Sequence, residues 1–519
     1  MATFDVLITH GRIVDGTGAP WFRGDIGIVG DRIAAVGPLN GANAKRVIDA
    51  GEQIVCPGFI DTHVHSDAVL LADPYHEPAV RQGVTTEILG QDGTSYAPMS
   101  QKNMAFMREY FAAVNGNPVV DWNWQSVAEY LNRLDRRIAI NVAYLVPHGA
   151  LRLEAMGLET RPPTASELET MRRLLVKSLD EGAAGYSTGL DYIPCVYATT
   201  DELVELCKTV ASYGGPYVTH IRYNRKGFDA AVEEALEIGE RSGVGVHISH
   251  YKGKAEHILG LIDAGRTAGI DVTFDTYPYL AGSSILAMMS LPEWAQEGGI
   301  AATVARLKAA DTRQRLRDRL ETFPWERMHI STVTRPEHKG YEGLNPKQAA
   351  DKAGKSVTDF VCDLLVAENM AVGVVQFPEP TYTEADLYRV MSHRAHMLGS
   401  DAIFIGGRPH PRAHGAFARY LGVYVREQKA LDLEEAIRHI TSAPARRFLL
   451  TDRGQVREGC AADLVVFDPE KVIDRATYED SRRFAEGITH VFVNGQLAVE
   501  NGQPTRALAG RALKAPWVK

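Results

Sequence analysis

Two histidines separated by one residue, His63 and His65, carry the clearest chemical signal in the chain. They follow the apolar residues Phe59 and Ile60, which predict a buried strand. Side chains two positions apart on a strand point to the same face, so both imidazoles can converge on one metal ion. The pair alone is weak evidence, because chance pairs are common among 17 histidines.

Three further polar residues stand at the ends of short β-like segments. His220 and His250 each end an apolar run, and Asp401 stands beside the apolar run 402–405. The C-terminal ends of the strands of a (β/α)8 barrel form its active face, so residues far apart in the sequence can meet there. The order His-x-His, His, His, Asp therefore predicts a metal site on such a barrel.

The alternation of segments predicts an α/β protein with two parts. Residues 1–57 and 441–519 alternate apolar and polar positions between turns, so we expect both chain ends to pair into one small β-sandwich. Residues 58–440 alternate strand-like and helix-like segments, which predicts a (β/α)8 barrel. An insertion at about 281–395 separates the seventh and eighth strands and is expected to overhang the active face as a lid or specificity subdomain.

Two strand predictions bear directly on the site. We expect residues 54–60 to form one buried strand, broken by a turn at Pro57 and Gly58. We expect the eighth barrel strand to cover residues 398–405. His247 lies three positions before His250, so strand alternation places it on the opposite face, packed behind the barrel.

The composition limits the partners and the compartment. The net charge of −9 (56 basic against 65 acidic residues) gives no reason to expect a nucleic-acid surface. The sequence has neither a signal-peptide pattern nor an apolar run long enough to cross a membrane. Five cysteines without close pairs suit a reducing compartment. We expect a cytoplasmic protein that binds neither nucleic acid nor membrane, and the oligomeric state stays open.

Motifs along nearly the whole chain resemble the N-acyl-D-amino-acid deacylase (D-aminoacylase) group of the amidohydrolase superfamily. They include the segments 57–65, 185–190, 219–222, 248–252, 275–279, 399–401, 410–412 and 461–467. The resemblance implies a metal-dependent hydrolase barrel that cleaves an N-acyl-D-amino acid into a carboxylate and a free D-amino acid. The preference for the D isomer rests on the resemblance alone.

One position departs from the pattern of that group. Its members usually carry Gly-Asn-Cys-Gly after the second strand, with the cysteine as a metal ligand, and this chain has Gly-Gln-Asp-Gly over residues 90–93. Asp92 can replace the thiolate as an anionic but harder ligand. An ordinary Asp-Gly turn is the alternative. Zinc is the expected metal, and Asp92 makes manganese or cobalt plausible.

The resemblance also implies a role for each site residue. We expect Asp92, His220 and His250 to hold the principal metal, while His63 and His65 bind a second, weaker metal or orient water and carbonyl. Asp401 is the expected general base, which takes the proton of water and passes it to the leaving nitrogen, and it could also contact the second metal. The expected substrate-binding residues are Lys252, Tyr277, Ser283 and Arg412.

Other functions remain as alternatives. A cyclic amidase of the hydantoinase or dihydroorotase kind would share the histidines, but the expected fourth strand ends in residues 185–189 without a lysine to bridge two metals. A dipeptidase or another amidase is kept open by Asp92. A barrel that serves only as an interaction scaffold would be expected to lose metal ligands, and here four histidines and Asp401 persist.

Overall fold

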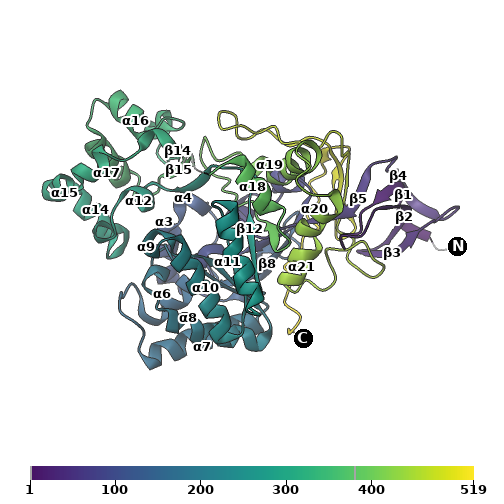
Figure 1. Ribbon diagram of the computed structural model, residues 1–519, viewed down its shortest axis with the longest axis horizontal. Coiled ribbons are helices and arrows are strands. Elements are labelled where there is room, and N and C mark those ends of the chain that lie inside the picture. The colour runs from purple at the N-terminus through teal and green to yellow at the C-terminus, as the bar shows by residue number, and fades with distance from the viewer. Residues whose placement is uncertain (1–2, 379–381, 519) are drawn as a thin grey trace.

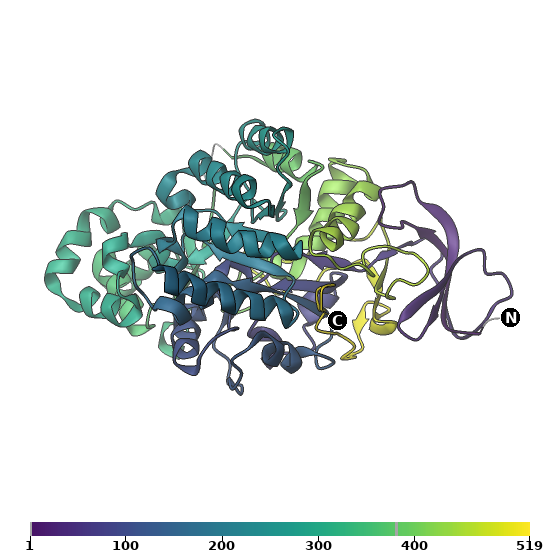
Figure 2. The ribbon, with the colours of Figure 1, turned by 90° about the horizontal axis from the view of Figure 1, so that it is seen from below.

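The computed structural model describes residues 3–378 and 382–518. Residues 1–2 and 519 of the expected β-sandwich, and residues 379–381 of the expected insertion, lie outside the described residues. The barrel occupies the middle of an elongated molecule, with a sheet domain at one end and a helical insertion at the other (Figure 1). The same order is visible in the view turned by 90° (Figure 2).

Eight parallel strands form the barrel and follow one another in chain order. They are β6 (Phe59–Asp61), β7 (Val84–Leu89), β8 (Asn141–Pro147), β9 (Gly185–Gly189), β10 (Pro216–His220), β11 (Gly245–Ile248), β12 (Val272–Thr276) and β16 (His396–Leu398). The last strand meets the first, since the N–H of Thr62 donates to the carbonyl of Leu398 at 3.3 Å. The expected barrel is confirmed.

Helices between the strands cover the outside of the barrel. The main ones are α7 (Ala165–Asp180), α8 (Thr200–Tyr213), α10 (Phe228–Ser242), α11 (Ala255–Thr267) and α20 (Leu433–Ile440). Helix α7 begins with a reciprocal cap between Thr164 and Glu167, and α8 ends at Gly214 in the left-handed conformation. These local signals determine where α7 begins and where α8 ends, before the chain enters the next strand.

The predicted strand over residues 54–60 proves to be two strands in two sheets. β5 (Ile54–Pro57) pairs with β17 (Leu464–Phe467) in the sheet domain, whereas β6 pairs with β7 in the barrel. Gly58 joins them, and a side chain there would lie 2.1 Å from Thr85 Oγ1. The hydrophobic run is continuous because both strands are fully buried, so hydrophobicity alone could not locate the boundary.

The eighth strand also differs from its prediction. β16 covers only His396–Leu398, not residues 398–405. After it the chain turns at Asp401, whose φ is 50°, and regains a single bridge between Ala402 and Val64. The predicted apolar run is therefore mostly loop, and this turn brings the Asp401 side chain to the active face.

Both chain ends form the sheet domain, as expected. Its nine strands are β1 (Thr3–Ile13), β2 (Phe22–Val29), β3 (Arg32–Gly37), β4 (Asn43–Asp49), β5, β17, β18 (Ile488–Val493), β19 (Gln496–Glu500) and β20 (Gln503–Pro504). Apolar side chains from the two ends, such as Ile26 and Leu464, share one core. The contact between β5 and β17 is what ties the N-terminal strands to the C-terminal ones.

The insertion between β12 and β16 has its own small sheet. β13 (Gly282–Ile285), β15 (Gly373–Gln376) and β14 (Met328–Thr332) pair in that spatial order. Its helices include α12 (Leu286–Ser290), α14 (Gly299–Lys308), α15 (Ala310–Glu321), α16 (Pro346–Ala353), α17 (Val357–Ala367) and α18 (Glu384–Met391). No helix in the described part of the chain is long and apolar enough to span a membrane.

Candidate metal centre and substrate cavity

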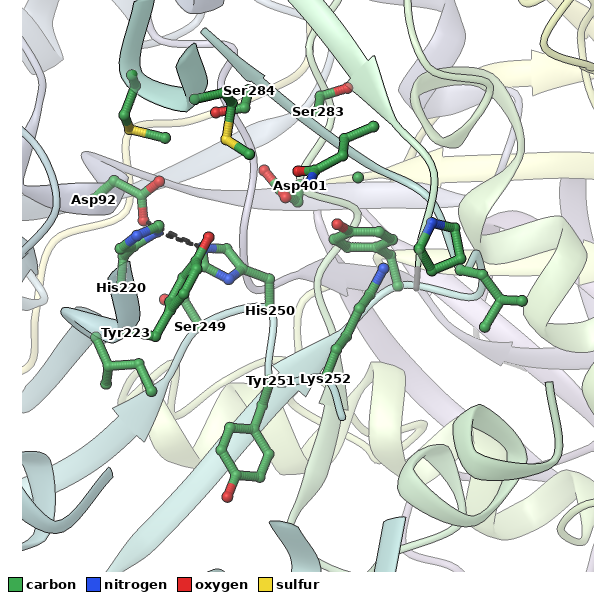
Figure 3. Close-up of a pocket in the computed structure, with 18 of the residues that line it drawn as sticks. Asp92, His220, Tyr223, Ser249, His250, Tyr251, Lys252, Ser283, Ser284 and Asp401 are labelled. Atoms are coloured by element: carbon green, nitrogen blue, oxygen red, sulfur yellow. Dashed lines mark hydrogen bonds and ion pairs between the residues drawn. The ribbon is translucent and has the colours of Figure 1, made fainter. Parts of the chain in front are cut away.

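The expected metal ligands meet at the C-terminal ends of the barrel strands. His63 and His65 follow β6, Asp92 lies in the 3₁₀ turn Gln91–Gly93 after β7, His220 ends β10, His250 follows β11, and Asp401 follows β16. Figure 3 shows Asp92, His220 and His250 grouped on one side of a cavity, with Asp401 beside them. The structure therefore brings together all six residues singled out from the sequence.

Asp92 lies between the other ligands. Its Oδ1 is 3.6 Å from His63 Nε2 and 3.9 Å from His250 Nε2, and its Oδ2 is 3.6 Å from His65 Nε2. Asp401 Oδ1 is 3.3 Å from His65 Nε2. These residues form two overlapping groups that could each hold a metal ion. One consists of His63, Asp92 and His250, and the other of His63, His65 and Asp401. In each group the donor atoms lie within 4.8 Å of one another.

Several donor atoms of these groups are buried without hydrogen-bond partners. Neither the two ring nitrogens of His63 nor Oδ1 of Asp92 forms a hydrogen bond with any of the described residues. Leaving such atoms buried and unpaired is costly, and native structures rarely do so. A divalent cation between His63 Nε2 and Asp92 Oδ1 would satisfy both of these atoms, and imidazole with carboxylate is a donor set that zinc, manganese and cobalt accept. The residues fit a metal.

The backbone is strained where three of these ligands sit. Asp92, His250 and Asp401 have φ values of 57°, 37° and 50°, in the left-handed region that non-glycine residues seldom adopt. Each such conformation costs on the order of 1–3 kcal/mol and persists only where the surroundings impose it. Such strain is a feature of functional sites, and here it turns the three side chains toward one point.

His220 contacts the group through His250. Its Nδ1 lies 2.9 Å from His250 Nε2, and its other ring nitrogen, Nε2, lies 3.1 Å from Asp191 Oδ2. His220 thus presents one nitrogen to the cluster and the other to a carboxylate outside it. Asp191 was not singled out in the sequence.

The electrostatic environment separates the two acids of the site. Burial raises the pKa of Asp92 to about 6, although His220 and His65 oppose the shift. Burial also acts to raise the pKa of Asp401, but Arg412 and the histidines His65, His63 and His250 together outweigh it and hold that pKa well below its usual range. Asp401 is therefore ionised at neutral pH.

A cavity of about 440 Å³ opens beside the cluster. Of the expected substrate-binding residues, Lys252, Tyr277 and Ser283 line it. Lys252 Nζ lies 3.2 Å from the centre of the Tyr277 ring and donates to the carbonyl of Tyr279 at 2.6 Å. The apolar part of the wall comes mainly from Val114, Leu280, Ile285, Met288, Met289 and Ile403. A carboxylate and an apolar group can thus be accommodated in one space.

Arg412 occupies a different position from the other three. It is fully buried at the start of α19 (Arg412–Arg419), and its Nη1 forms an ion pair with Asp401 Oδ2 at 2.9 Å. Its guanidinium lies 4.3 Å from the centre of the Tyr277 ring. Arg412 is thus placed to act on Asp401, behind the cavity wall.

A second carboxylate below the cluster also escaped the sequence analysis. Asp275 accepts from the backbone N–H of His250 at 2.7 Å, and its Oδ2 lies 3.8 Å from His63 Nδ1. The same oxygen is 2.9 Å from His247 Nε2. His247 also packs against Phe448 of the barrel interior, so it supports the site from within instead of lying behind the barrel.

Comparisons with known proteins agree with this geometry. The amidohydrolase family model matches residues 46–499. N-acyl-D-glutamate deacylase of Alcaligenes xylosoxydans xylosoxydans is 36% identical over 98% of this chain and 96% of its own, and D-aminoacylase of the same organism is 35% identical over 98% and 97%.

A solved structure matches the whole chain as well. The crystal structure of N-acyl-D-glutamate deacylase from Bordetella bronchiseptica, in complex with zinc and a phosphonate mimic of the tetrahedral intermediate, superposes with a TM-score of 0.85. The two sequences are 34% identical, and the match covers 99% of this chain and 100% of that one. With its barrel, its cluster of histidines and aspartates and these relatives, the chain belongs to the amidohydrolase family.

Proposed function

We propose that the protein hydrolyses the amide bond of N-acyl-D-amino acids, giving a carboxylate and a free D-amino acid. One observation carries the proposal. Two groups of candidate metal ligands share His63, and they lie at the edge of a cavity that is also lined by Lys252. Two relatives of similar length are named N-acyl-D-glutamate deacylase and D-aminoacylase, and these names support the same class of substrate.

A metal ion would be held by His63, His65, Asp92, His220, His250 and Asp401. When bound, a divalent metal acidifies water and polarises a carbonyl, which is the chemistry that amide hydrolysis needs. We propose zinc, supported by the histidine-rich donor set and by the zinc in the Bordetella bronchiseptica relative.

Asp401 is the proposed general base and acid. Its carboxylate lies at the mouth of the ligand cluster, and the ion pair with Arg412 keeps it ionised, ready to accept the proton of the attacking water. The same proton can then pass to the amine nitrogen as it leaves. Lys252 and Ser283 line the space where the free α-carboxylate of the substrate would bind.

The cyclic-amidase alternative finds less support. β9 has the sequence Gly-Tyr-Ser-Thr-Gly and so offers no lysine as a bridging ligand at that strand end. The apolar wall around Met288 and Met289 suits the side chain or acyl chain of a linear substrate.

The five cysteines are all buried and free, which supports a reducing, cytoplasmic location.

The test measures amine release from matched N-acetyl-D- and N-acetyl-L-amino acids, with hydantoins and dipeptides as competing classes. Asp401→Asn serves as the matched control, since it keeps the size of the side chain and removes the base. The proposal expects release from D substrates only, reduced about 10²–10⁴-fold in the variant. Faster turnover of a hydantoin or a dipeptide by the same zinc-loaded protein would overturn it.

A further inference from the structure

We propose that Asp191 is a positioning residue of the metal centre, which orients His220 and fixes the ring nitrogen with which it binds metal. This inference rests on the metal centre of the proposed function but not on the identity of the substrate. It concerns the hydrogen bonds that His220 makes to other residues of the protein.

The first observation is the contact itself. Asp191 Oδ2 lies 3.1 Å from His220 Nε2, and both side chains are 3% exposed. A neutral imidazole carries its proton on one nitrogen, and a carboxylate acceptor at Nε2 places the proton there. The lone pair of Nδ1 is then free, and this nitrogen faces His250 Nε2 at 2.9 Å.

The second observation is that Asp191 is itself held in place. The side-chain amide of Asn224 donates to the same Oδ2 at 2.7 Å, from α9 (Tyr223–Lys226). The backbone N–H of Leu190 donates to the carbonyl of His220 at 2.9 Å. The segment after β9 is therefore fastened to His220 through both backbone and side chain.

The third observation links this segment to Asp92. A side chain at Gly189 would lie 2.2 Å from the carbonyl oxygen of Asp92, so the end of β9 packs directly on the Asp92 turn. Within the described residues, the other oxygen of Asp191, Oδ1, is buried without a hydrogen-bond partner. A buried carboxylate with an unpaired oxygen costs free energy unless a cation lies nearby, and a metal held by His220 would supply that charge.

Carboxylate partners of this kind raise the basicity of a ligating histidine and prevent its ring from rotating. Removing one typically weakens metal affinity about 10–100-fold. A merely structural hydrogen bond would affect stability instead. Asp463 provides the matched control, because it is also a buried aspartate, bonded to Asn141 and Asn494 between the barrel and the sheet domain.

The experiment measures the dissociation constant for Zn²⁺ by competition with a chromogenic chelator, in full-length wild type, Asp191→Ala, Asp191→Asn and Asp463→Asn. We expect Asp191→Ala to weaken zinc binding about 10–100-fold. Asp191→Asn keeps a hydrogen-bond acceptor and should recover part of the loss. Asp463→Asn should lower the thermal midpoint of the metal-free protein and leave the dissociation constant unchanged.

A dissociation constant for folded Asp191→Ala within about twofold of the wild-type value would overturn the inference. If that variant does not fold, Asp191→Asn decides alone: an unchanged zinc affinity together with an unchanged visible spectrum of the Co²⁺-loaded protein would overturn it. Zinc binding is measured without substrate. A failure of the proposed deacylation therefore leaves this result standing, and the reverse also holds.

Discussion

Arg412 and Asp401 form a buried ion pair, with Nη1 2.9 Å from Oδ2, directly behind the cluster of metal ligands. The pair joins α19 to the turn after β16, two elements that meet only in the folded barrel. It also explains why a carboxylate that is almost entirely removed from water remains ionised.

Replacing Arg412 by glutamine should move the pH profile of hydrolysis. Burial acts to raise the pKa of Asp401, and Arg412 is the largest influence that lowers it, so the pKa must rise when the guanidinium is lost. A base works in its deprotonated form, and the acid limb of kcat/KM should therefore shift to higher pH. Arg412→Lys, which keeps the charge, is the control. A glutamine variant with an unmoved acid limb would contradict this role.

Asp92 should govern metal preference. A carboxylate oxygen is a harder donor than a thiolate, so Asp92→Cys is expected to increase zinc affinity relative to manganese affinity. Asp92→Asn removes the negative charge and should weaken binding of both metals. Parallel chelator competitions with Zn²⁺ and Mn²⁺ measure the ratio. An unchanged ratio in Asp92→Cys would mean that Asp92 forms only a turn.

Lys252 should matter only for substrates with a free carboxylate. Its side-chain nitrogen is held against the Tyr277 ring and the carbonyl of Tyr279, on the cavity wall. A charge-assisted hydrogen bond contributes about 1.5–3 kcal/mol, so Lys252→Met should raise KM for an N-acetyl-D-amino acid about 10–100-fold. The corresponding N-acetyl-D-amino acid amide, which lacks the carboxylate, should show little change. Equal losses for both substrates would point to a general packing defect.

His148 should make stability depend on pH above neutrality. Its Nε2 lies 2.9 Å from Glu202 Oε1, and both side chains are fully buried. Burial acts to lower the pKa of His148, but Cys195 and Glu202 outweigh it and raise that pKa from 6.5 to about 9. The folded protein therefore holds this proton more tightly than the unfolded chain does.

The resulting stabilisation is complete below pH 6.5 and disappears as the pH rises through about 9. Its size is on the order of 3 kcal/mol. Urea unfolding of wild type and His148→Gln at about pH 6 and about pH 9.5 checks it, because the difference between the two proteins should shrink at the higher pH. A constant difference would contradict the protonated pair.

The sequence indicated the candidate metal ligands at the ends of strands and missed the residues that support them. His63, His220 and His250 could be found because each polar residue interrupts a run of apolar ones. Asp191 carries no such signal, since an aspartate after a strand is ordinary turn chemistry. Asp275 lies within β12, and the sequence does not show which residues its carboxylate contacts. Their importance depends on hydrogen bonds to residues 25–29 positions away, which only the closed barrel creates.

The turn predicted at Pro57 and Gly58 does separate β5 from β6, but the sequence did not show that the two strands belong to different sheets. Hydrophobic periodicity reports burial, and residues 54–60 are buried throughout, but it does not report which neighbouring strand a segment pairs with. The short β16 was overestimated because the apolar residues after Asp401 pack as a loop against the barrel mouth. The fold class and the residues that meet at the candidate site could thus be predicted, whereas strand partners and supporting carboxylates could not.

If the cluster around His63 and Asp92 holds the catalytic metal, hydrolysis must depend on that metal, and a titration measures this dependence. The protein is stripped with a chelator, titrated with Zn²⁺, and assayed at each step for amine release from an N-acetyl-D-amino acid. We expect no release from stripped protein and a rise to full rate as the metal site fills. Undiminished release from protein shown to contain no metal would contradict it.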